Sequence, residues 1–580
     1  MDAPTLDTRN VNSLWAGVLV ETLVRCGVRR AVVSPGSRSA PLAMAFAAHP
    51  KFEALAVLDE RSAAFFALGL AKQEMRPVVL VCTSGTAGAN YFPAVIEAHE
   101  SGVPLLVLTA DRPPELRDCA SGQTIDQQKL YGGYVNFFHE IAVPESSEPR
   151  LRYLRQTVAQ AVRQTMVPVA GPVQLNVPFR DPLAPVSDGG ATERFAATIN
   201  WQFFFTHLAA PEPAPSWGAL PRIAPEGRGV IVVGPEQPGD VGAFVAAVAE
   251  ISRRLGWPVL ADGASPLRHY AAQVPHLVTT YDVILRQAAA AEQLKPEVIL
   301  CLGGWPVSKV LRSWIEAGEP AIWLVTERAD NRDALHGRTR PLAFALPQLA
   351  AALPMASAEN GYERMWARAE ERIRPVLDAR LRAEAAMFEP KVAWLLAQHL
   401  PAGTTLFVAN SMPMRDVEYV TPPGDRALRP LCNRGANGID GTLSTALGAA
   451  HGAGRPAVLL TGDLALLHDA NGFLLRPKFR GALTVVLINN CGGGIFEHLP
   501  VAQFDPPFEE FFATPQAVDF PKLCAAHGVE HVAVRDWEHF TVLISALPAT
   551  GIRVLEVSTD RKRDAAMRKQ WFAEIAASLD

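Results

Sequence analysis

Two short apolar runs, each ending in polar residues, constrain the fold of the last third of this chain most strongly. The first run is 457–461 and ends at Gly462-Asp463-Leu464; the second is 483–488 and ends at Asn489-Asn490. Both have the length and composition of a buried strand, and residues 468–475 between them have a helical pattern. The sequence therefore predicts a βαβ unit that brings Asp463 and Asn490 to the carboxyl ends of neighbouring parallel strands.

The residues at these two strand ends have the chemistry of a magnesium site. The Asp463 carboxylate, the Asn490 amide oxygen and the Gly492 carbonyl are hard oxygen ligands, which Mg²⁺ completes with diphosphate oxygens and water. A Gly-Asp pair after a strand is usually a plain turn, but its spacing from Asn-Asn inside one βαβ unit favours a site. The pattern resembles the thiamin diphosphate (ThDP) motif, in which Gly-Asp-Gly is followed at a distance by Asn-Asn; Leu464 replaces the third glycine.

Composition narrows the class of protein. A length of 580 residues permits roughly three to four domains of ~150 residues each. The net charge is −5 without a basic block, so nucleic acid is not an expected partner. The seven cysteines lack CxxC or Cys/His spacing, which favours reduced thiols over structural zinc. With no signal-peptide pattern and no apolar run near the ~20 residues that span a bilayer, we expect a soluble cytoplasmic protein.

Three α/β blocks follow one another along the chain, and we expect each to be a doubly wound domain with a mainly parallel sheet. The predicted domains are 1–188, 205–353 and 354–580. Strand-like runs occur at 31–33, 54–58, 78–82 and 105–109 in the first block and at 229–234, 298–304 and 321–325 in the second. Residues 184–226 are rich in Pro, Ala, Gly and Ser, which predicts a linker, and 363–386 predicts a connecting helix.

Four strand ends in the first block carry polar residues. Ser37 and Arg38 follow one strand, Glu60 a second, residues 83–88 a third and Arg112 a fourth. Each is by itself an ordinary turn or helix cap, but together they predict a polar cleft for an anionic substrate. ThDP chemistry needs one glutamate beside the pyrimidine N1′, and Glu60 is the candidate.

Seven stretches of the chain carry a more specific resemblance. They are SPGSRSAPL, DERSAAFFALGLAK, TSGTAGANYFPAVIEA, TADRPPELRDCASGQTIDQ, NSMPMRD, NRGANGIDGTLSTALG and GDLALLHDANGF. These resemble the 2-succinyl-5-enolpyruvyl-6-hydroxy-3-cyclohexene-1-carboxylate synthase family, the ThDP enzymes of menaquinone biosynthesis. The Gly-Asp-Leu variant is also the form found in that family.

The resemblance implies an activity and an assembly. The family decarboxylates 2-oxoglutarate and joins the resulting four-carbon unit to isochorismate in a conjugate, Stetter-like addition, releasing CO₂. It uses ThDP with Mg²⁺ or Mn²⁺. The three blocks would be the pyrimidine-binding, central and diphosphate-binding domains. Glu60 and Asp463 would meet only across a subunit interface, which implies a homodimer or homotetramer.

The resemblance also implies roles for individual residues. The isochorismate set is Arg38, Arg112, Gln123, Lys309 and Ser411, and Ser37 is a further candidate for binding substrate. Arg415 and Arg434 would hold the carboxylates derived from 2-oxoglutarate and, with Glu60, act in catalysis. The cofactor set is Glu60, Ser84, Gly85, Asn410, Ser411, Ile439, Gly462, Asp463, Leu464, Asn490, Ile495 and Phe496, and the metal ligands are Asp463, Asn490 and Gly492.

One part of this pattern departs from some relatives. Val310 stands where a second basic residue can follow the lysine, and Arg312 should face another side of a helix. Acid-base groups beyond Glu60, including His451, His468 and His498, are left open.

Three other interpretations compete with this one. Another ThDP-dependent 2-oxoacid enzyme, such as an acetolactate synthase, would share Glu60, Asp463 and Asn490 without needing the arginines. A dinucleotide- or flavin-binding protein is disfavoured because residues 229–234 lack the GxGxxG pattern. A catalytically inactive, regulatory relative is disfavoured by the intact Glu60 and metal motif.

Overall fold

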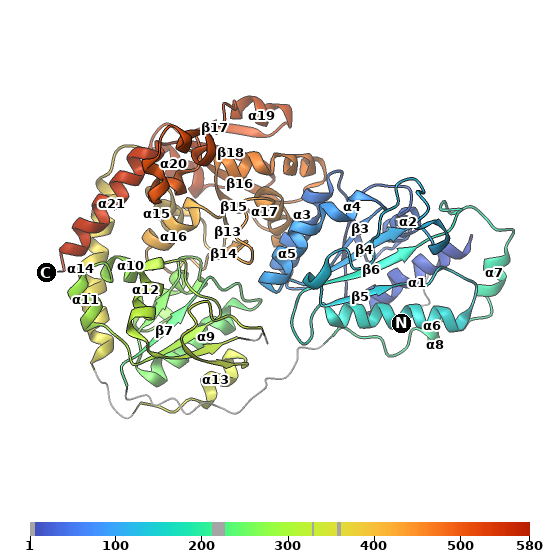
Figure 1. Cartoon of the computed structure of the whole chain (residues 1–580), viewed down its shortest axis with the longest axis horizontal. Helices are drawn as coiled ribbons and strands as arrows, with labels where there is room; N and C mark the ends of the chain where they lie inside the picture. Colours follow the sequence, from blue (N-terminus) through green and yellow to red (C-terminus); the bar gives the residue numbers. More distant parts are fainter. Residues whose placement is uncertain (1–5, 212–226, 327–329, 357–360, 580) are drawn as a thin grey trace. The chain divides into compact units, whose positions relative to one another are not determined.

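Three six-stranded sheets, A, B and C, dominate the structure (Figure 1). The computed structural model describes residues 6–211, 227–326, 330–356 and 361–579. Every pair of neighbouring strands in the three sheets is parallel. The prediction of three α/β domains with mainly parallel sheets is therefore confirmed.

Sheet A is formed by the first block. Its strands are β1 Arg30–Val33, β2 Glu53–Ala56, β3 Val78–Cys82, β4 Leu105–Asp111, β5 Phe137–Glu140 and β6 Pro172–Pro178. Its helices are α1 Val11–Arg25, α2 Ala40–Ala48, α3 Glu60–Glu74, α4 Thr86–Asn90, α5 Phe92–Ser101, α6 Glu148–Gln164, α7 Ala191–Ala196 and α8 Trp201–Phe204. Strands β3, β4 and β6 are buried along their whole length, as expected for a parallel sheet covered on both faces.

Sheet B is formed by the second block. Its strands are β7 Gly229–Val233, β8 Val259–Ala261, β9 Leu277–Val278, β10 Val298–Leu302, β11 Ala321–Val325 and β12 Arg338–Leu342. Its helices are α9 Val241–Leu255, α10 Tyr281–Ile284, α11 Ala288–Gln293, α12 Lys309–Gly318 and α13 Leu346–Ala352. The predicted connecting helix is α14 Tyr362–Ala383.

Sheet C is formed by the third block. Its strands are β13 Thr405–Val408, β14 Arg429–Cys432, β15 Ala457–Gly462, β16 Ala482–Asn489, β17 Glu530–Ala533 and β18 Gly551–Ser558. Its α-helices are α15 Glu389–His399, α16 Met412–Val420, α17 Thr442–Ala453, α18 Asp463–His468, α19 Phe520–Ala526, α20 Trp537–Ser545 and α21 Arg561–Ala577. The predicted helix over 468–475 is instead divided between α18 and the 3₁₀ helix η5 Ala470–Lys478. The break falls at Asp469, whose buried carboxylate accepts hydrogen bonds from the Ser444 backbone and hydroxyl.

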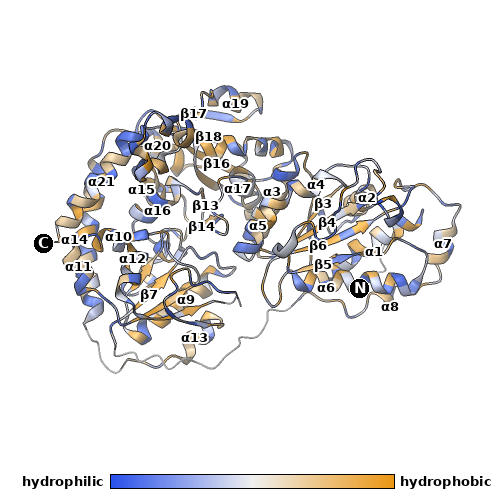
Figure 2. Cartoon of the chain, viewed as in Figure 1, coloured by the Kyte–Doolittle hydropathy of each residue, from blue (hydrophilic) through white to orange (hydrophobic). Residues whose placement is uncertain are grey.

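The chain forms two compact units. The sheet A unit comprises residues 1–214, 433–452 and 469–479, and the sheet B–C unit comprises residues 215–432, 453–468 and 480–580. One hydrophobic cluster continues from sheet B through Trp366 and Leu377 of α14 into sheet C. Apolar strands and mixed outer helices recur in all three domains (Figure 2).

The predicted linker is wrong for part of its length. Helices α7 and α8 form within it, and Ile199, Phe204 and Phe205 are buried in the core of the sheet A unit. The Pro and Ala content predicted a linker. Burying these apolar side chains, however, lowers the free energy relative to leaving them exposed to water. Residues 212–226 of the predicted linker lie outside the described residues.

Sheets A and C have the same topology. Their strand orders are β2-β1-β3-β4-β6-β5 and β14-β13-β15-β16-β18-β17, which are equivalent when each is counted from its first strand. In both sheets the order of the strands reverses between the first and third strands. Ligands of open parallel sheets bind outside the carboxyl ends of the strands at such a point. The first and third blocks therefore share one sheet topology.

Sheet B has the order β9-β8-β7-β10-β11-β12, which is found in many dinucleotide-binding domains. The Glu236 side chain, however, lies against Gly303, which follows β10. The strand order of this sheet reverses there, between β7 and β10. A carboxylate there disfavours a bound diphosphate, in agreement with the missing glycine pattern.

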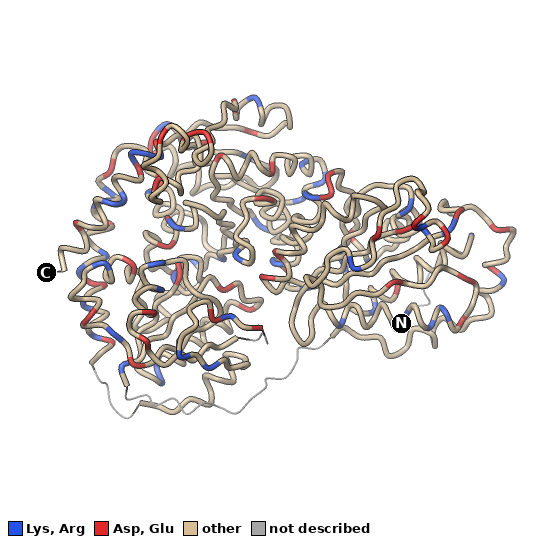
Figure 3. The backbone as a smooth tube through the Cα atoms, in the orientation of Figure 1, with Lys and Arg blue, Asp and Glu red and all other residues tan. Residues whose placement is uncertain are grey.

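No helix among the described residues is long and apolar enough to cross a membrane. Basic and acidic residues are interspersed along the described backbone (Figure 3).

Helices α3 and α17 approach closely through two glycines within the sheet A unit. A Cβ atom on Gly69 would lie 1.9 Å from the Thr445 carbonyl oxygen, and one on Gly448 would lie 2.0 Å from the Phe66 carbonyl oxygen. Each helix therefore presents a glycine to the backbone of the other, and any side chain there would force the helices apart.

Replacing Gly69 or Gly448 with alanine should reduce the free energy of unfolding by about 1–3 kcal/mol, because the added methyl group overlaps a backbone carbonyl. Gly242→Ala in α9 is a matched control, since its Cβ would meet only the Asp240 carboxylate at 3.5 Å. Denaturant unfolding followed by circular dichroism measures the three variants. Equal stability of the Gly69 and Gly242 variants would contradict the prediction.

Candidate functional site

The four predicted polar strand ends of the first block lie at one edge of sheet A. Strands β2, β1, β3 and β4 are consecutive neighbours and all parallel. Their carboxyl ends lead to Glu60, Ser37 and Arg38, Ser84, and Arg112, respectively. The fold thus brings together residues that are as much as 75 positions apart (112 − 37) in the sequence.

Two arginines occur together at this edge. The Arg38 side chain is 7% exposed, and its Nη1 donates to the Phe179 carbonyl at 2.8 Å. Its buried Nε has no hydrogen-bond partner among the described residues. Burial, and then the positive charge of Arg112, lower the pKa of the Arg38 guanidinium. Two neighbouring cations and an unused donor form a suitable site for a carboxylate.

The turn after β3 packs beside Arg112 and includes Ser84 and Gly85, with the Gln123 side chain against it. The Arg112 guanidinium donates to the Ser84 hydroxyl, and the Gln123 amide donates to the Ser84 carbonyl at 3.0 Å. Gly85 has φ of +89°, and a Cβ atom there would lie 3.0 Å from Gln123 Cγ. A glycine at position 85 therefore allows the Gln123 side chain to pack against the turn after β3.

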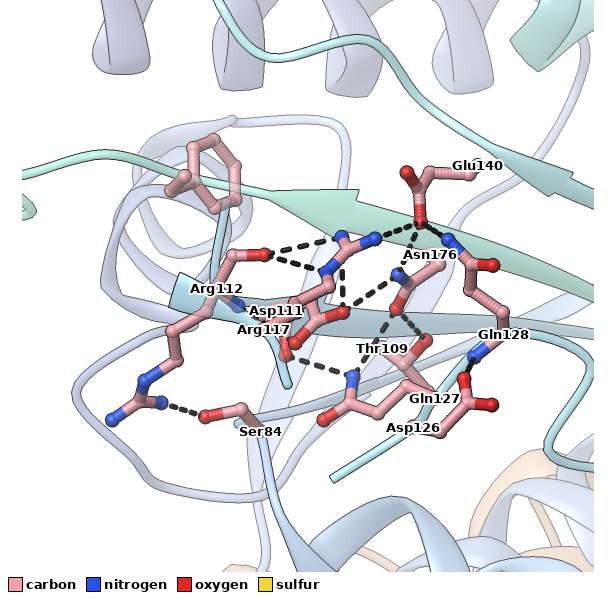
Figure 4. Close-up of polar contacts among 12 residues, drawn as sticks. Ser84, Thr109, Asp111, Arg112, Arg117, Asp126, Gln127, Gln128, Glu140 and Asn176 are labelled. Atoms are coloured by element: carbon pink, nitrogen blue, oxygen red, sulfur yellow. Dashed lines mark hydrogen bonds and ion pairs between the residues drawn. The ribbon is translucent and has the colours of Figure 1, made fainter. Parts of the chain in front are cut away.

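Arg117 holds the main chain of Arg112 in place (Figure 4). Its Nε and Nη2 atoms donate to the Arg112 carbonyl at 3.2 and 3.1 Å. The same guanidinium pairs with Asp111 at 3.2 Å and with Glu140 at 2.8 Å. Burial raises the pKa of the Asp111 carboxyl. The charge of Arg117 compensates this buried acid while anchoring the neighbouring residue.

Gln127 and Asn176 complete this network. Gln127 accepts from the Gly85 N–H at 2.9 Å and donates to Asn176 Oδ1 at 3.1 Å. Asn176 in turn donates to Asp111 at 2.9 Å (Figure 4). Sequence reasoning missed Arg117, Gln127, Glu140 and Asn176, because no local motif marks a residue whose partner lies on another strand.

Glu60 is the first residue of α3 and is half-buried. Asp59 caps the helix by accepting from the Ser62 N–H at 2.8 Å, which leaves the Glu60 carboxylate free of the capping role. Burial, and then the negative charge of Glu60, raise the pKa of the Cys82 thiol at the end of β3. The Glu60 carboxylate thus lies near the point where the strand order of sheet A reverses, between β1 and β3.

Arg434 and Ile439 belong to the sheet A unit, although they follow β14 in the sequence. Their loop is fixed to α5 because the buried Glu97 carboxylate accepts from the Gly435 and Ala436 N–H groups at 3.1 and 2.7 Å. Both side chains are half-buried.

The predicted metal ligands are adjacent in the sheet B–C unit. Strands β15 and β16 are paired, with Gly462 opposite Ile488, so Asp463 and Asn490 leave the sheet at neighbouring positions. Asp463 Oδ2 accepts from the Gly492 N–H at 2.8 Å. Burial raises the pKa of Asp463 to about 6, because it removes the carboxylate from water.

The unused oxygen of Asn490 tests whether these residues fit a metal. Asn490 Oδ1 is buried and has no hydrogen-bond partner among the described residues. Gly492 has φ of +135°, and a Cβ there would lie 2.4 Å from the Ala513 carbonyl, so the loop accepts only glycine. No group of three or more His, Cys, Asp or Glu side chains with the arrangement of a metal site occurs among the described residues. An open oxygen site of this kind fits Mg²⁺ or Mn²⁺ bound together with phosphate oxygens.

Asn410 and Ser411 follow β13, the strand next to β15. Ser411 has φ of +71°, an uncommon conformation for a residue with a side chain, and such strain often occurs at functional sites. Arg415 of α16 donates to the Ser411 carbonyl at 2.8 Å. Leu464 lies in the first turn of α18, and its N–H donates to the Asp463 carboxylate at 2.8 Å.

Ile495 and Phe496 lie in the 3₁₀ helix η6 Gly494–His498, where the Phe496 ring packs edge-on against Phe512. Lys309 is exposed at the first turn of α12. Val310 packs against the hydrophobic core, so position 310 contributes to packing.

The candidate residues are thus divided between the two units. The sheet A unit carries Ser37, Arg38, Glu60, Ser84, Gly85, Arg112, Gln123, Arg434 and Ile439. The sheet B–C unit carries Lys309, Asn410, Ser411, Arg415, Gly462, Asp463, Leu464, Asn490, Gly492, Ile495 and Phe496.

Three family models match successive parts of the chain. The chain matches "Thiamine pyrophosphate enzyme, N-terminal TPP binding domain" over residues 15–130 and "Middle domain of thiamine pyrophosphate" over residues 218–408. It matches "Thiamine pyrophosphate enzyme, C-terminal TPP binding domain" over residues 426–557. The protein is therefore a ThDP-dependent enzyme.

Curated relatives extend the match over nearly the whole chain. The protein of Gloeothece citriformis is 51% identical, covering 97% of this chain and 98% of its own length. The Microcystis aeruginosa protein is 51% identical with 98% and 99% coverage, and that of Synechococcus sp. strain JA-3-3Ab is 52% identical with 99% and 98% coverage. All three are named 2-succinyl-5-enolpyruvyl-6-hydroxy-3-cyclohexene-1-carboxylate synthase. The chain belongs to this family of synthases.

Proposed function

We propose that this enzyme converts 2-oxoglutarate and isochorismate into 2-succinyl-5-enolpyruvyl-6-hydroxy-3-cyclohexene-1-carboxylate and CO₂ in the cytoplasm. The pair of buried and half-buried arginines at the edge of sheet A carries this proposal. Arg38 and Arg112 suit an acceptor that has carboxylates, whereas a carboligase acting on pyruvate alone has no need for both.

Asp463, Asn490 and Gly492 would hold the cofactor through Mg²⁺ or Mn²⁺, and Glu60 would hold a proton at the pyrimidine N1′. ThDP, when bound, supplies the electron sink for decarboxylation and carbon–carbon bond formation. The remaining cofactor contacts would come from Ser84, Gly85, Asn410, Ser411, Ile439, Gly462, Leu464, Ile495 and Phe496.

The basic residues would sort the substrate carboxylates. Arg38, Arg112 and Lys309, with the polar Ser37, Gln123 and Ser411, would bind isochorismate. Arg415 and Arg434 would bind the carboxylate retained from 2-oxoglutarate. Guanidinium groups suit this task because they bind a carboxylate through two parallel hydrogen bonds.

The active enzyme would be a homodimer or homotetramer. This proposal rests on the resemblance to ThDP enzymes in which the residues matching Glu60 and Asp463 meet across a subunit interface. A symmetric dimer would complete two equivalent sites from such halves.

Glu60→Gln should reduce turnover at least about 100-fold, because the amide cannot exchange the proton that a carboxylate holds. CO₂ release from 2-oxoglutarate, with ThDP and Mg²⁺ and with or without isochorismate, measures this. Glu74→Gln at the other end of α3 is the control and should leave turnover unchanged. Turnover of pyruvate in place of 2-oxoglutarate would support the acetolactate synthase-like alternative.

Arg112→Lys should raise the KM for isochorismate about 10- to 100-fold, since a charge-assisted hydrogen bond contributes about 1.5–3 kcal/mol. The KM for 2-oxoglutarate should change little. Arg180→Lys is the matched control, because Arg180 makes a paired contact with Glu115 at an exposed position of the same unit. Steady-state kinetics with each substrate varied in turn separates the two constants; equal changes in both would contradict the assignment.

A further inference from the structure

The orientation of the Asn490 side chain is determined by Glu389. Asn490 Nδ2 lies 2.6 Å from Glu389 Oε1. An ionised carboxylate can only accept hydrogen bonds, so the amide nitrogen must face Glu389 and the amide oxygen must face the opposite way. That oxygen is the buried, unpartnered Oδ1.

Glu389 is itself fixed from several sides. It is 1% exposed at the start of α15, and its N–H donates to Asp564 at 3.0 Å. Its second carboxylate oxygen accepts from the buried Arg568 of α21. Arg568 places a positive charge directly against this buried carboxylate.

Arg568 also reaches the helix that carries a candidate substrate ligand. Its Nε and Nη2 donate to the two oxygens of Asp416, each at 2.8 Å. Asp416 lies in α16 directly after Arg415. One buried guanidinium therefore connects the metal ligand Asn490, through Glu389, to the helix of Arg415.

We propose that Glu389 is a positioning residue that directs the Asn490 oxygen to the metal, and that Arg568 couples this orientation to α16. The proposal rests on the cation site described above. It assigns no contact with the metal or substrate to Glu389 itself.

Glu389→Gln tests the proposal with almost no change in volume. The introduced glutamine has one acceptor, and the positively charged Arg568 is the stronger donor for it. Its amide nitrogen would then face Asn490, which must rotate its own oxygen toward it and present NH₂ to the cation. We expect the apparent Kd for Mg²⁺ to rise about 10- to 100-fold, as is typical when the partner of a metal ligand is lost.

The double variant Glu389→Gln/Asn490→Asp should restore metal binding. It exchanges amide and carboxylate between the two positions and keeps the net charge. The new carboxylate accepts from the glutamine and retains an oxygen for the cation. Asn490→Asp alone adds a charged oxygen ligand but places it against the Glu389 carboxylate, so a positioning role predicts tighter Mg²⁺ binding in the double variant than in Asn490→Asp alone.

Glu556→Gln is the matched control. Asn489 donates to Glu556 at 2.6 Å, so the same pair of side chains occurs one residue earlier in the chain, at the last residue of β16. Asn489 is not a proposed ligand, and its loss of this contact should leave the Kd for Mg²⁺ unchanged.

The measurement is isothermal titration of Mg²⁺ into the full-length protein at saturating ThDP, with circular dichroism as the check of folding. A folded Glu389→Gln variant that binds Mg²⁺ like the unaltered protein, or a double variant that remains weak, would overturn the inference while leaving the cation site intact. Absence of Mg²⁺ binding to the unaltered protein in this titration would overturn both the cation site and the inference. If Glu389→Gln fails to fold, the Kd for Mg²⁺ of the double variant tests the inference, since the hydrogen bonds between positions 389, 490 and 568 are all paired in that variant.

Discussion

Parallel pairing of neighbouring strands is the constraint on which the candidate site depends. In sheets A and C every strand runs in the same direction, so all carboxyl ends reach one edge. The backbone groups of the strands are satisfied within the sheet, which leaves the following turns available for ligands. Glu60 and Asp463 both occupy such turns, in two sheets with equivalent topology.

Buried charges hold these turns in place. Arg117 does so at the edge of sheet A by joining Asp111 and Glu140 and by binding the Arg112 carbonyl. Arg568 has the corresponding role at sheet C, where it joins Glu389 and Asp416. An unpaired charge in either place would be costly, so each cluster is expected to be formed as a whole. Each cluster contacts a residue that we assign to binding: Arg117 contacts Arg112, and Glu389 contacts Asn490.

Sequence reasoning predicted the fold class, nine of the eighteen strands in the described residues, and the two strand ends that carry the candidate metal ligands. Strands such as β3 and β15 are continuous apolar runs, and their lengths leave little choice of structure. The prediction was wrong for residues 191–205. Their composition is typical of a linker, but their aromatic residues pack into the core. Sequence reasoning also missed the break at Asp469, because the cause is a contact with Ser444 on another helix.

The sequence by itself therefore determined the buried strands with continuous apolar runs, the ThDP motif and the membership of the family, because these depend on local pattern and spacing. Only the tertiary structure decided which side chains act through others. Glu389 is 101 residues from Asn490, and Arg568 is 152 residues from Asp416. No periodicity or motif links positions so far apart; folding brings them together because a buried charge or amide must find its partner wherever the chain supplies one.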